Sequence, residues 1–215
     1  MTDREIYNFL RSAGMTKEGA AALEANFQAE SSLRSNNAQD SYHIPDDQYV
    51  AEVDAGIRNF IDDIGFGYAQ WTLKSRKQKL LEYAKEYGTS IADPIMQLRF
   101  SVLELKSDFP DIWQLLTTSH DLLECTKQVL YIYENPKIKN LGTRYETAQK
   151  FYMKFDGESD PVPVKEQDAE TTTIVRMLQA CMCQNGYWPA DKIDGKKTAE
   201  FRKAIQEYAV DVAKS

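Results

Sequence analysis

The side chain of Glu30 is the first candidate for chemistry. It falls at the end of a mostly apolar helix that the sequence predicts from about Thr16 to Ser31. A carboxylate on such a face is costly to bury, so burial would raise its pKa. General-acid cleavage of a glycosidic bond requires a carboxylic acid that keeps its proton near neutral pH. A solvated glutamate at a helix end is the alternative from pattern alone.

Residues 65–72 form a second candidate stretch, which reads Gly-Phe-Gly-Tyr-Ala-Gln-Trp-Thr. Two glycines one residue apart allow the backbone to approach a ligand or another segment closely. The amide of Gln70 can hydrogen-bond acetamido and hydroxyl groups. The indole of Trp71 can stack on a sugar ring, with packing in the core as the alternative.

These stretches, with the polar loop between them, resemble the phage tail lysozyme family and, more distantly, goose-type lysozymes and soluble lytic transglycosylases. The resemblance covers residues from about 3 to 155 and continues through Tyr-Glu-Asn-Pro at 133–136 to Arg144. It implies a mainly α, lysozyme-like α(+β) catalytic domain. Such a domain would cleave the β-1,4 MurNAc–GlcNAc bond of bacterial peptidoglycan without a cofactor or metal.

The resemblance also implies roles for individual residues. Glu30 would protonate the glycosidic oxygen, and Gln70 would line the groove beside it. Glu134 would either orient the surroundings of Glu30 or pair with a base. Three aromatic residues of the same motifs would lie in the groove and contact sugar: Tyr68, Trp71 and Tyr133.

The second carboxylate is less clearly marked. In goose-type enzymes one aspartate precedes the Gly-Phe-Gly segment by a few residues. Asp62 and Asp63 hold about this position, and Asp62 is the predicted water-positioning base. Thr72 stands where those enzymes place another aspartate. An inverting hydrolase needs both an acid and a base, whereas a lytic transglycosylase needs one acid/base, so both reactions stay open. The alternatives for the base are Asp40, Asp46 and Asp47.

Two departures from the family pattern flank the predicted acid. Glu24-Ala25 stands where many relatives carry a small or apolar residue and then glycine. Ser32 replaces a frequent glycine. Both changes bear on helix packing and loop shape, and they leave Glu30 in place.

Apolar periodicity and capping residues predict the helices that must position these groups. Thr16, Ser75 and Asp93 are the predicted N-caps, the last followed by Pro94 at the first helical position, and Gly88 is the predicted stop of the helix that begins at Ser75. Residues 32–64, after the helix that carries Glu30, form a polar connection, and a connection of this length is usually functional. A helix could form within it around 48–59, and short strands could form in the 40s to 60s. The remaining helices are expected at residues 3–13, 16–31, 75–87, 94–108, 111–116, 119–133 and 143–155.

Composition divides the chain into a catalytic domain (1–155), a linker (156–170) and a small helical domain (171–215). The linker contains two prolines, a glycine and six acidic residues, and it has little to bury. The last segment resembles small three-helix peptidoglycan-binding modules, with a helical cap that binds no ligand as the alternative. The residues that carry this resemblance are Val175, Leu178, Gln179, Gly186-Tyr187, Asp194-Gly195 and Thr198.

The formal net charge of −7 argues against general nucleic-acid binding, which needs a cationic face. No run of eighteen apolar residues is present, so membrane insertion is not expected. Residues 1–5 are charged and lack the features of a secretory signal. We therefore expect synthesis in a host bacterial cytoplasm and action on the cell wall, as a phage or prophage endolysin or a tail component. The oligomeric state stays open.

Other function classes find less support in the sequence. A cysteine peptidase would use Cys125 and His120, but five residues apart on one helix they do not share a face well. Cys181 and Cys183, with only two histidines in the chain, do not make a zinc site. A tail or wall-binding protein that keeps the fold without the activity is the remaining alternative.

Overall fold

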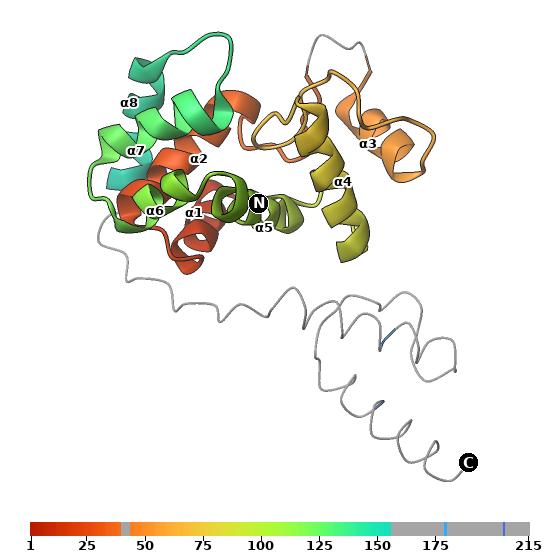
Figure 1. Ribbon diagram of the computed structural model, residues 1–215, viewed down its shortest axis with the longest axis horizontal. Helices are drawn as coiled ribbons and strands as arrows, with labels where there is room; N and C mark the ends of the chain where they lie inside the picture. Colours follow the sequence, from red (N-terminus) through yellow and green to blue (C-terminus); the bar gives the residue numbers. More distant parts are fainter. Residues whose placement is uncertain (40–43, 156–178, 180–203, 205–215) are drawn as a thin grey trace. The chain divides into compact units, whose positions relative to one another are not determined.

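The computed structural model describes residues 1–39 and 44–155, together with Gln179 and Ala204. The ranges 1–39 and 44–155 are mainly helical, as predicted (Figure 1). The chain divides into two compact units, Met1–Pro163 and Val164–Ser215. The predicted linker and C-terminal module lie outside the described residues, apart from Gln179 and Ala204. Within the described part, no helix is long and apolar enough to cross a membrane. The helices in chain order are α1 (Asp3–Ser12), α2 (Lys17–Ser31), α3 (Asp46–Asp54), α4 (Lys74–Tyr87), α5 (Pro94–Asp108), α6 (Pro110–Thr118), α7 (Leu122–Gln128), the π-helix η1 (Val129–Glu134) and α8 (Leu141–Phe155).

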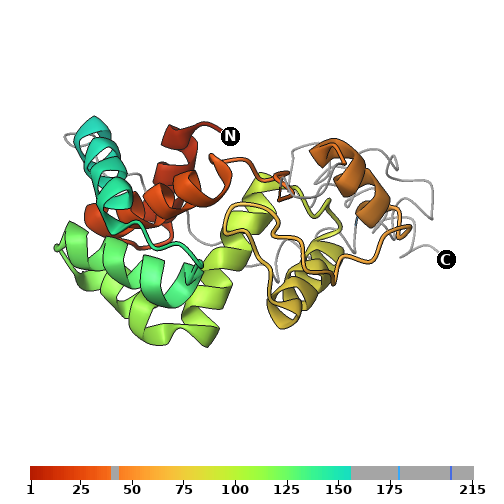
Figure 2. The same cartoon turned by 90° about the horizontal axis from the view of Figure 1, so that it is seen from above.

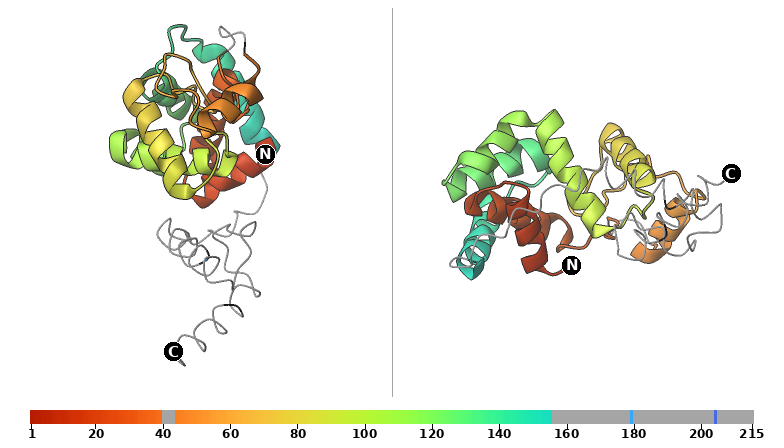
Figure 3. Two further views of the ribbon diagram at one scale, coloured as in Figure 1. Left: turned by 90° about the vertical axis from the view of Figure 1, so that its right-hand side faces the viewer. Right: turned by 90° about the horizontal axis from the view of Figure 1, so that it is seen from below.

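The helices of the first unit form two groups (Figures 1 and 2). Helices α1, α2, α6, α7 and α8 pack together, and α3 and α4 lie on the other side of the unit. Helix α5 runs from the first group to the second, as Figure 3 shows from below. It contacts α6 at one side and α4 at the other.

Helix α2 is the centre of the first group, in contact with α1, α6, α7, η1 and α8. Every residue from Glu18 to Phe27 is buried. The helix begins at the predicted cap, where Thr16 Oγ1 accepts a hydrogen bond from the Gly19 N–H at 3.0 Å. The same hydroxyl donates to the carbonyl oxygen of Ser119 at 2.8 Å. The cap thus ties the start of α2 to the end of α6.

The polar connection predicted at residues 32–64 contains α3, which ends at Asp54, earlier than expected. Instead of strands, the part that the structure describes has two isolated bridges, Ala38 with Phe66 and Phe66 with Trp71. The rings of Tyr49, Phe60 and Phe66 pack together there, with centroids 5.4 to 6.4 Å apart. This aromatic cluster fixes the turn that carries residues 65–72.

Two helix boundaries differ from the prediction. Helix α4 begins at Lys74 after Leu73, so Ser75 lies inside the helix and is not its cap. The helix expected over 119–133 is divided into α7 and η1, and it ends at Asn135 with a φ of 46°. Short π-helical segments occur frequently at functional sites. Here the segment ends on Tyr133 and Glu134.

Candidate active site

Glu30 lies in the last turn of α2, where the chain bends sharply. Ser32 and Leu33 both have a φ of 56°, a left-handed conformation that non-glycine residues rarely adopt. Because two such residues follow one another, the bend is strained, and strain of this kind clusters at functional sites. The Glu30 side chain is 15% exposed, so it is sheltered but still accessible.

Arg144 on α8 holds the Glu30 carboxylate in place. Its Nη2 atom donates to Glu30 Oε1 at 2.5 Å. Its Nη1 atom donates to the side-chain and backbone oxygens of Asn26, at 2.9 and 3.3 Å. Asn26 is itself fixed, since its Nδ2 atom donates to the Ala22 carbonyl oxygen at 2.8 Å. One buried guanidinium therefore joins the end of α2 to the start of α8.

The role of Arg144 was missed by the sequence analysis, which placed it in the family resemblance without a function. On α8 the buried residues are Arg144, Ala148, Phe151 and Phe155. An arginine at the head of an otherwise apolar helical stripe is the signal that could have marked it, because a buried charge requires a partner.

Glu134 is the second carboxyl group at this site. Its Oε1 atom is buried and has no hydrogen-bond partner. Burial raises the pKa of Glu134 well above its ordinary value, and the charge of Glu30 raises it further. The guanidinium groups of Arg76 and Arg144 act in the opposite direction. Glu30 and Arg144 thus belong to the charged surroundings of Glu134.

A second, buried network of hydrogen bonds is centred on the carboxylate of Glu104 on α5. Arg76 of α4 donates two hydrogen bonds of 2.7 Å to its carboxylate. Trp71 Nε1 and the Tyr133 hydroxyl donate to Glu104 Oε2 at 3.1 and 3.0 Å. Trp71 is 0% exposed and Tyr133 is 1% exposed. Their expected contact with sugar is therefore corrected, because both rings lie in the core and support the site from within.

Tyr68 requires the same correction. It is 1% exposed, and its ring stacks on Phe27 of α2 with centroids 5.7 Å apart. Phe27 lies one turn before Glu30, so this stacking brings the segment 65–72 against the end of α2 that carries Glu30. Tyr68 positions the turn and has no surface on which a sugar could stack.

Gln70 is partly exposed and has a φ of 44°. Its Nε2 atom donates to the carbonyl oxygens of Asn37 and Gly67 at 3.1 and 3.0 Å. A Cβ atom on Gly65 would lie 2.8 Å from Gln70 Oε1, so a larger residue there would require the Gln70 side chain to move. The amide group thus braces the turn, and an additional contact with substrate stays a proposal.

Asp62 belongs to a different cluster. Its carboxylate pairs with Nζ of Lys77, a side chain with 0% exposure, and accepts a hydrogen bond from the Tyr49 hydroxyl at 3.0 Å. The same ammonium donates to the Ile64 carbonyl oxygen at 2.7 Å. Burial, the largest cause, lowers the pKa of Lys77, and the Asp62 carboxylate opposes this shift. These contacts explain Asp62 as the counter-charge of a buried lysine.

Cys125 is a buried free thiol, and burial raises its pKa to about 11. A reactive cysteine needs the opposite shift. His120 is exposed and faces Glu18 at 3.2 Å rather than Cys125. Residues 1–39 and 44–155 contain no group of three or more histidine, cysteine, aspartate or glutamate side chains that could hold a metal ion.

The fold and this group of side chains define a mainly helical, lysozyme-like protein. The family model described as phage tail lysozyme matches residues 1–155, and the chain belongs to this family. Membership indicates a peptidoglycan-degrading role of the lysozyme type. A comparison with curated proteins gave no match.

Proposed function

We propose that residues 1–155 form a glycosidase that cleaves the β-1,4 bond between MurNAc and GlcNAc in bacterial peptidoglycan. Glu30 protonates the glycosidic oxygen as the bond to the anomeric carbon breaks. The observation that carries the proposal is the position of Glu30, sheltered at the strained end of α2 and held by Arg144 beside a second carboxyl group. General acids of glycosidases have this kind of sheltered, oriented carboxyl group. The match to the phage tail lysozyme family agrees with it.

We propose that the protein is made in the cytoplasm of a host bacterium and acts on the cell wall, either during phage entry or at release. Residues 171–215 are proposed to bind the wall, on the resemblance given above.

A lytic transglycosylase is the second candidate, and one observation favours it. The Asp62 carboxylate pairs with Lys77 and accepts a hydrogen bond from Tyr49, contacts that suit a counter-charge better than a base. A transglycosylase needs no second carboxylate, because a hydroxyl group of the sugar itself attacks the anomeric carbon and gives an anhydro product. Glu134 is a carboxyl group whose charged surroundings include Glu30. Burial raises its pKa, whereas a base must be ionised.

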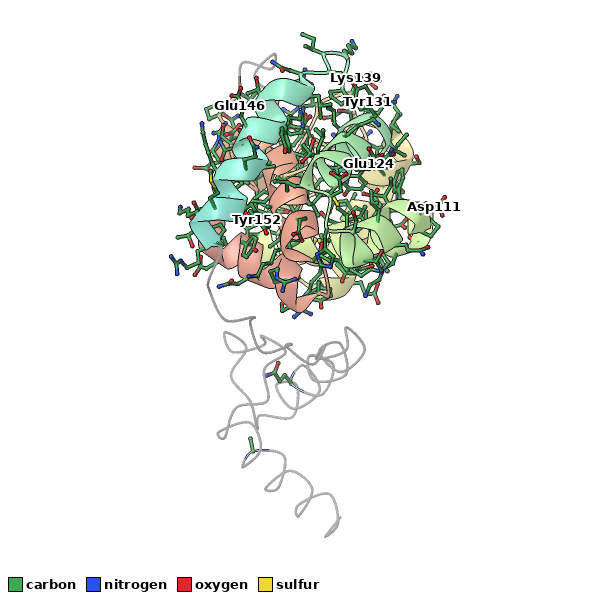
Figure 4. The ribbon with its side chains drawn as sticks, turned by 90° about the vertical axis from the view of Figure 1, so that its left-hand side faces the viewer. Asp111, Glu124, Tyr131, Lys139, Glu146 and Tyr152 are labelled. Atoms are coloured by element: carbon green, nitrogen blue, oxygen red, sulfur yellow. The ribbon has the colours of Figure 1, made fainter. Side chains whose placement is uncertain are left out.

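The test compares the clearing of a Gram-positive cell suspension by the wild type and by Glu30→Gln. We expect Glu30→Gln to lose activity by about 100-fold or more, because general-acid catalysis is worth roughly 10²–10⁴-fold. Glu146→Gln is the matched control, since Glu146 lies on the exposed face of α8 (Figure 4) and should leave clearing unchanged. Equal clearing by Glu30→Gln and the wild type would exclude the acid assignment. No clearing by the wild type on any wall would favour a non-catalytic tail or wall-binding protein.

Mass spectrometry of the released muropeptides separates the two reactions. Hydrolysis gives reducing ends, whereas transglycosylation gives anhydro ends. If the fragments released first carry only anhydro ends, the protein is a transglycosylase. If they carry only reducing ends, it is a hydrolase.

A further inference from the structure

The loop between η1 and α8 carries two lysines and an exposed isoleucine at its centre. Residues 135–140 read Asn-Pro-Lys-Ile-Lys-Asn, so Lys137 and Lys139 flank Ile138. Ile138 is 84% exposed, and both lysines are exposed as well. Among the residues that the structure describes, no acidic side chain pairs with either lysine. The function proposed above gives these three side chains no role.

This loop ends at the helix that holds the proposed acid. The carbonyl oxygen of Asn140 accepts a hydrogen bond from the Arg144 N–H at 3.4 Å, and its side-chain oxygen accepts one from the Thr143 N–H at 3.2 Å. The guanidinium group of Arg144 in turn binds the carboxylate of Glu30. The loop is therefore one helical turn away from the residue that holds Glu30, and it lies at the edge of the proposed site.

The ammonium group of Lys139 is restrained by an aromatic ring. It lies 5.4 Å from the centroid of the Tyr131 ring, and Figure 4 shows the two residues close together. A cation–π contact of this kind orients the ammonium group without neutralising its charge. Tyr131 is itself 39% exposed. The loop thus presents an oriented cation next to exposed apolar surface.

The charge of the protein makes a local cation near the site important for a negatively charged substrate. The formal net charge is −7, so the protein as a whole repels an anionic polymer. Peptidoglycan is such a polymer, because the lactyl group of MurNAc carries a peptide stem with free carboxylates and alanine methyl groups. The stem starts on the sugar whose glycosidic bond is cleaved, so it must pass the edge of the site. Lysine matches its carboxylates, and an exposed isoleucine matches its methyl groups.

We propose that Lys137, Ile138 and Lys139 form a stem-binding loop, which holds the acidic peptide stem of the MurNAc residue that is cleaved at Glu30. This inference rests on the proposed function, because it takes peptidoglycan as the substrate. The two ammonium groups pair with carboxylates of the stem, and Ile138 contacts an alanine methyl group. The loop thereby selects peptidoglycan with charged stems over glycan strands without stems.

The test measures binding without cleavage, with Glu30→Gln as the parent protein. Fluorescence anisotropy gives its affinity for labelled, soluble, uncross-linked glycan strands that are free of teichoic acid. Three kinds of strand are compared: strands with native stems, strands whose stem carboxylates are converted to amides, and strands whose stems an amidase has removed. Adding Lys137→Gln and Lys139→Gln together should weaken binding of native stems about fivefold, as the loss of two exposed ion pairs implies. The other two affinities should not change.

Lys150→Gln is the matched control, since Lys150 is an exposed lysine of α8 to which the described part of the chain gives no ion pair. It should leave all three affinities unchanged. Equal binding of native stems with and without the two loop substitutions would overturn the proposal. An equal loss for all three kinds of strand would overturn it as well, because a stem-binding loop does not contact a strand without stems. Weaker binding to phosphatidylglycerol vesicles, with strand binding unchanged, would assign the loop to an anionic lipid surface instead.

Cleavage of the same strands by protein with Glu30 intact gives a second readout. The ratio of kcat/KM for native stems to kcat/KM for amidated stems does not depend on how much of a variant is folded. The two loop substitutions together should lower this ratio about fivefold, mainly through a higher KM for native stems. Lys150→Gln should keep the wild-type ratio. An unchanged ratio in the loop variant would contradict a role in binding stem carboxylates.

The two proposals fail in different ways. A wild type that cleaves no strand would end the proposed function, and the binding measurement would still report on the loop. An active Glu30→Gln would end the acid assignment, and the ratio of cleavage rates would then test the loop. Unchanged binding by the loop variant, with an active wild type and an inactive Glu30→Gln, would end the stem-binding loop and leave the glycosidase standing.

Discussion

Among the residues that the structure describes, three basic side chains are largely or wholly buried and paired with an acid from a different part of the chain. Arg144 pairs with Glu30, Arg76 with Glu104, and Lys77 with Asp62. Removing one partner of such a pair leaves an uncompensated buried charge. These pairs therefore connect the chemistry of the site directly to the stability of the fold.

The role of Asp62 can be decided by one substitution. A counter-charge of Lys77 affects stability, whereas a water-positioning base affects activity. Asp62→Asn leaves the ammonium of Lys77, 0% exposed, without its counter-charge. We expect the free energy of unfolding to fall by about 3 kcal/mol, as for other broken buried pairs. Urea unfolding measures this, and wall clearing per folded molecule should stay within a few-fold of the wild type.

Asp63→Asn is the matched control. Asp63 is the next residue, its side chain is 89% exposed, and its ion pair with Lys74 is 3.7 Å long. It should leave stability unchanged within about 0.5 kcal/mol, as surface substitutions usually do. If Asp62→Asn instead keeps its stability and loses activity by orders of magnitude, Asp62 is the base that the sequence predicted.

At the scale of elements, α2 positions Glu30 because both of its ends are fixed. Its first turn lies against α6 so closely that a Cβ atom on Gly19 would be 2.1 Å from the carbonyl oxygen of Leu116. Gly19→Ala should therefore destabilise the protein by about 1–3 kcal/mol, as overpacking does, although alanine favours helices more than glycine. Chemical unfolding measures the change.

Gly142→Ala on α8 is the control for this substitution. The nearest atom to a Cβ at that position is 3.7 Å away, an ordinary contact. This variant should be neutral or more stable by up to about 1 kcal/mol. A Gly19→Ala protein as stable as Gly142→Ala would show that α2 and α6 are free to separate.

The sequence predicted the helices well where the signals are local. The cap at Thr16, Asp93 with Pro94, and the stop at Gly88 were all read correctly, since each acts within one helical turn. The π-helix η1 was not predicted, because apolar spacing over 119–133 fits a continuous α-helix. The burial of Tyr68 and Tyr133 was not predicted either, and core packing of Trp71 was only the alternative to a sugar contact. Their burial follows from partners far along the chain, such as Phe27 and Glu104.

At the scale of the whole molecule, the candidate site depends on contacts that no local pattern contains. Glu30 and Arg144 are 114 residues apart in sequence, and Trp71 and Glu104 are 33 apart. The family resemblance named Glu30 and Glu134 as candidates, because their motifs are short and ordered. The pairing between motifs required the folded unit, in which four helices each contribute a charged side chain to the surroundings of Glu134.

The stability of the whole unit should also depend on pH through Glu24. This residue is one of the departures from the family pattern near Glu30. Glu24 is 0% exposed, and neither of its carboxyl oxygens has a hydrogen-bond partner. Burial, the largest cause, raises the pKa of Glu24 to about 9, with a further rise from the charge of Asp3 and an opposing effect of Lys154. The folded protein therefore keeps this proton well above neutral pH.

The sign follows from comparing the folded and unfolded chains. Between about pH 4.5 and 9 the unfolded chain has lost the Glu24 proton and the folded chain has not, so rising pH favours unfolding. Each pH unit in this range costs about 1.4 kcal/mol, so Glu24→Gln should gain up to about 4 kcal/mol over the wild type between pH 5 and pH 8. Urea unfolding of both proteins at these two pH values measures the difference, with Glu146→Gln expected to follow the wild type. If the curves of Glu24→Gln and the wild type stay parallel with pH, Glu24 is ionised in the folded protein and must have a partner or solvent contact there.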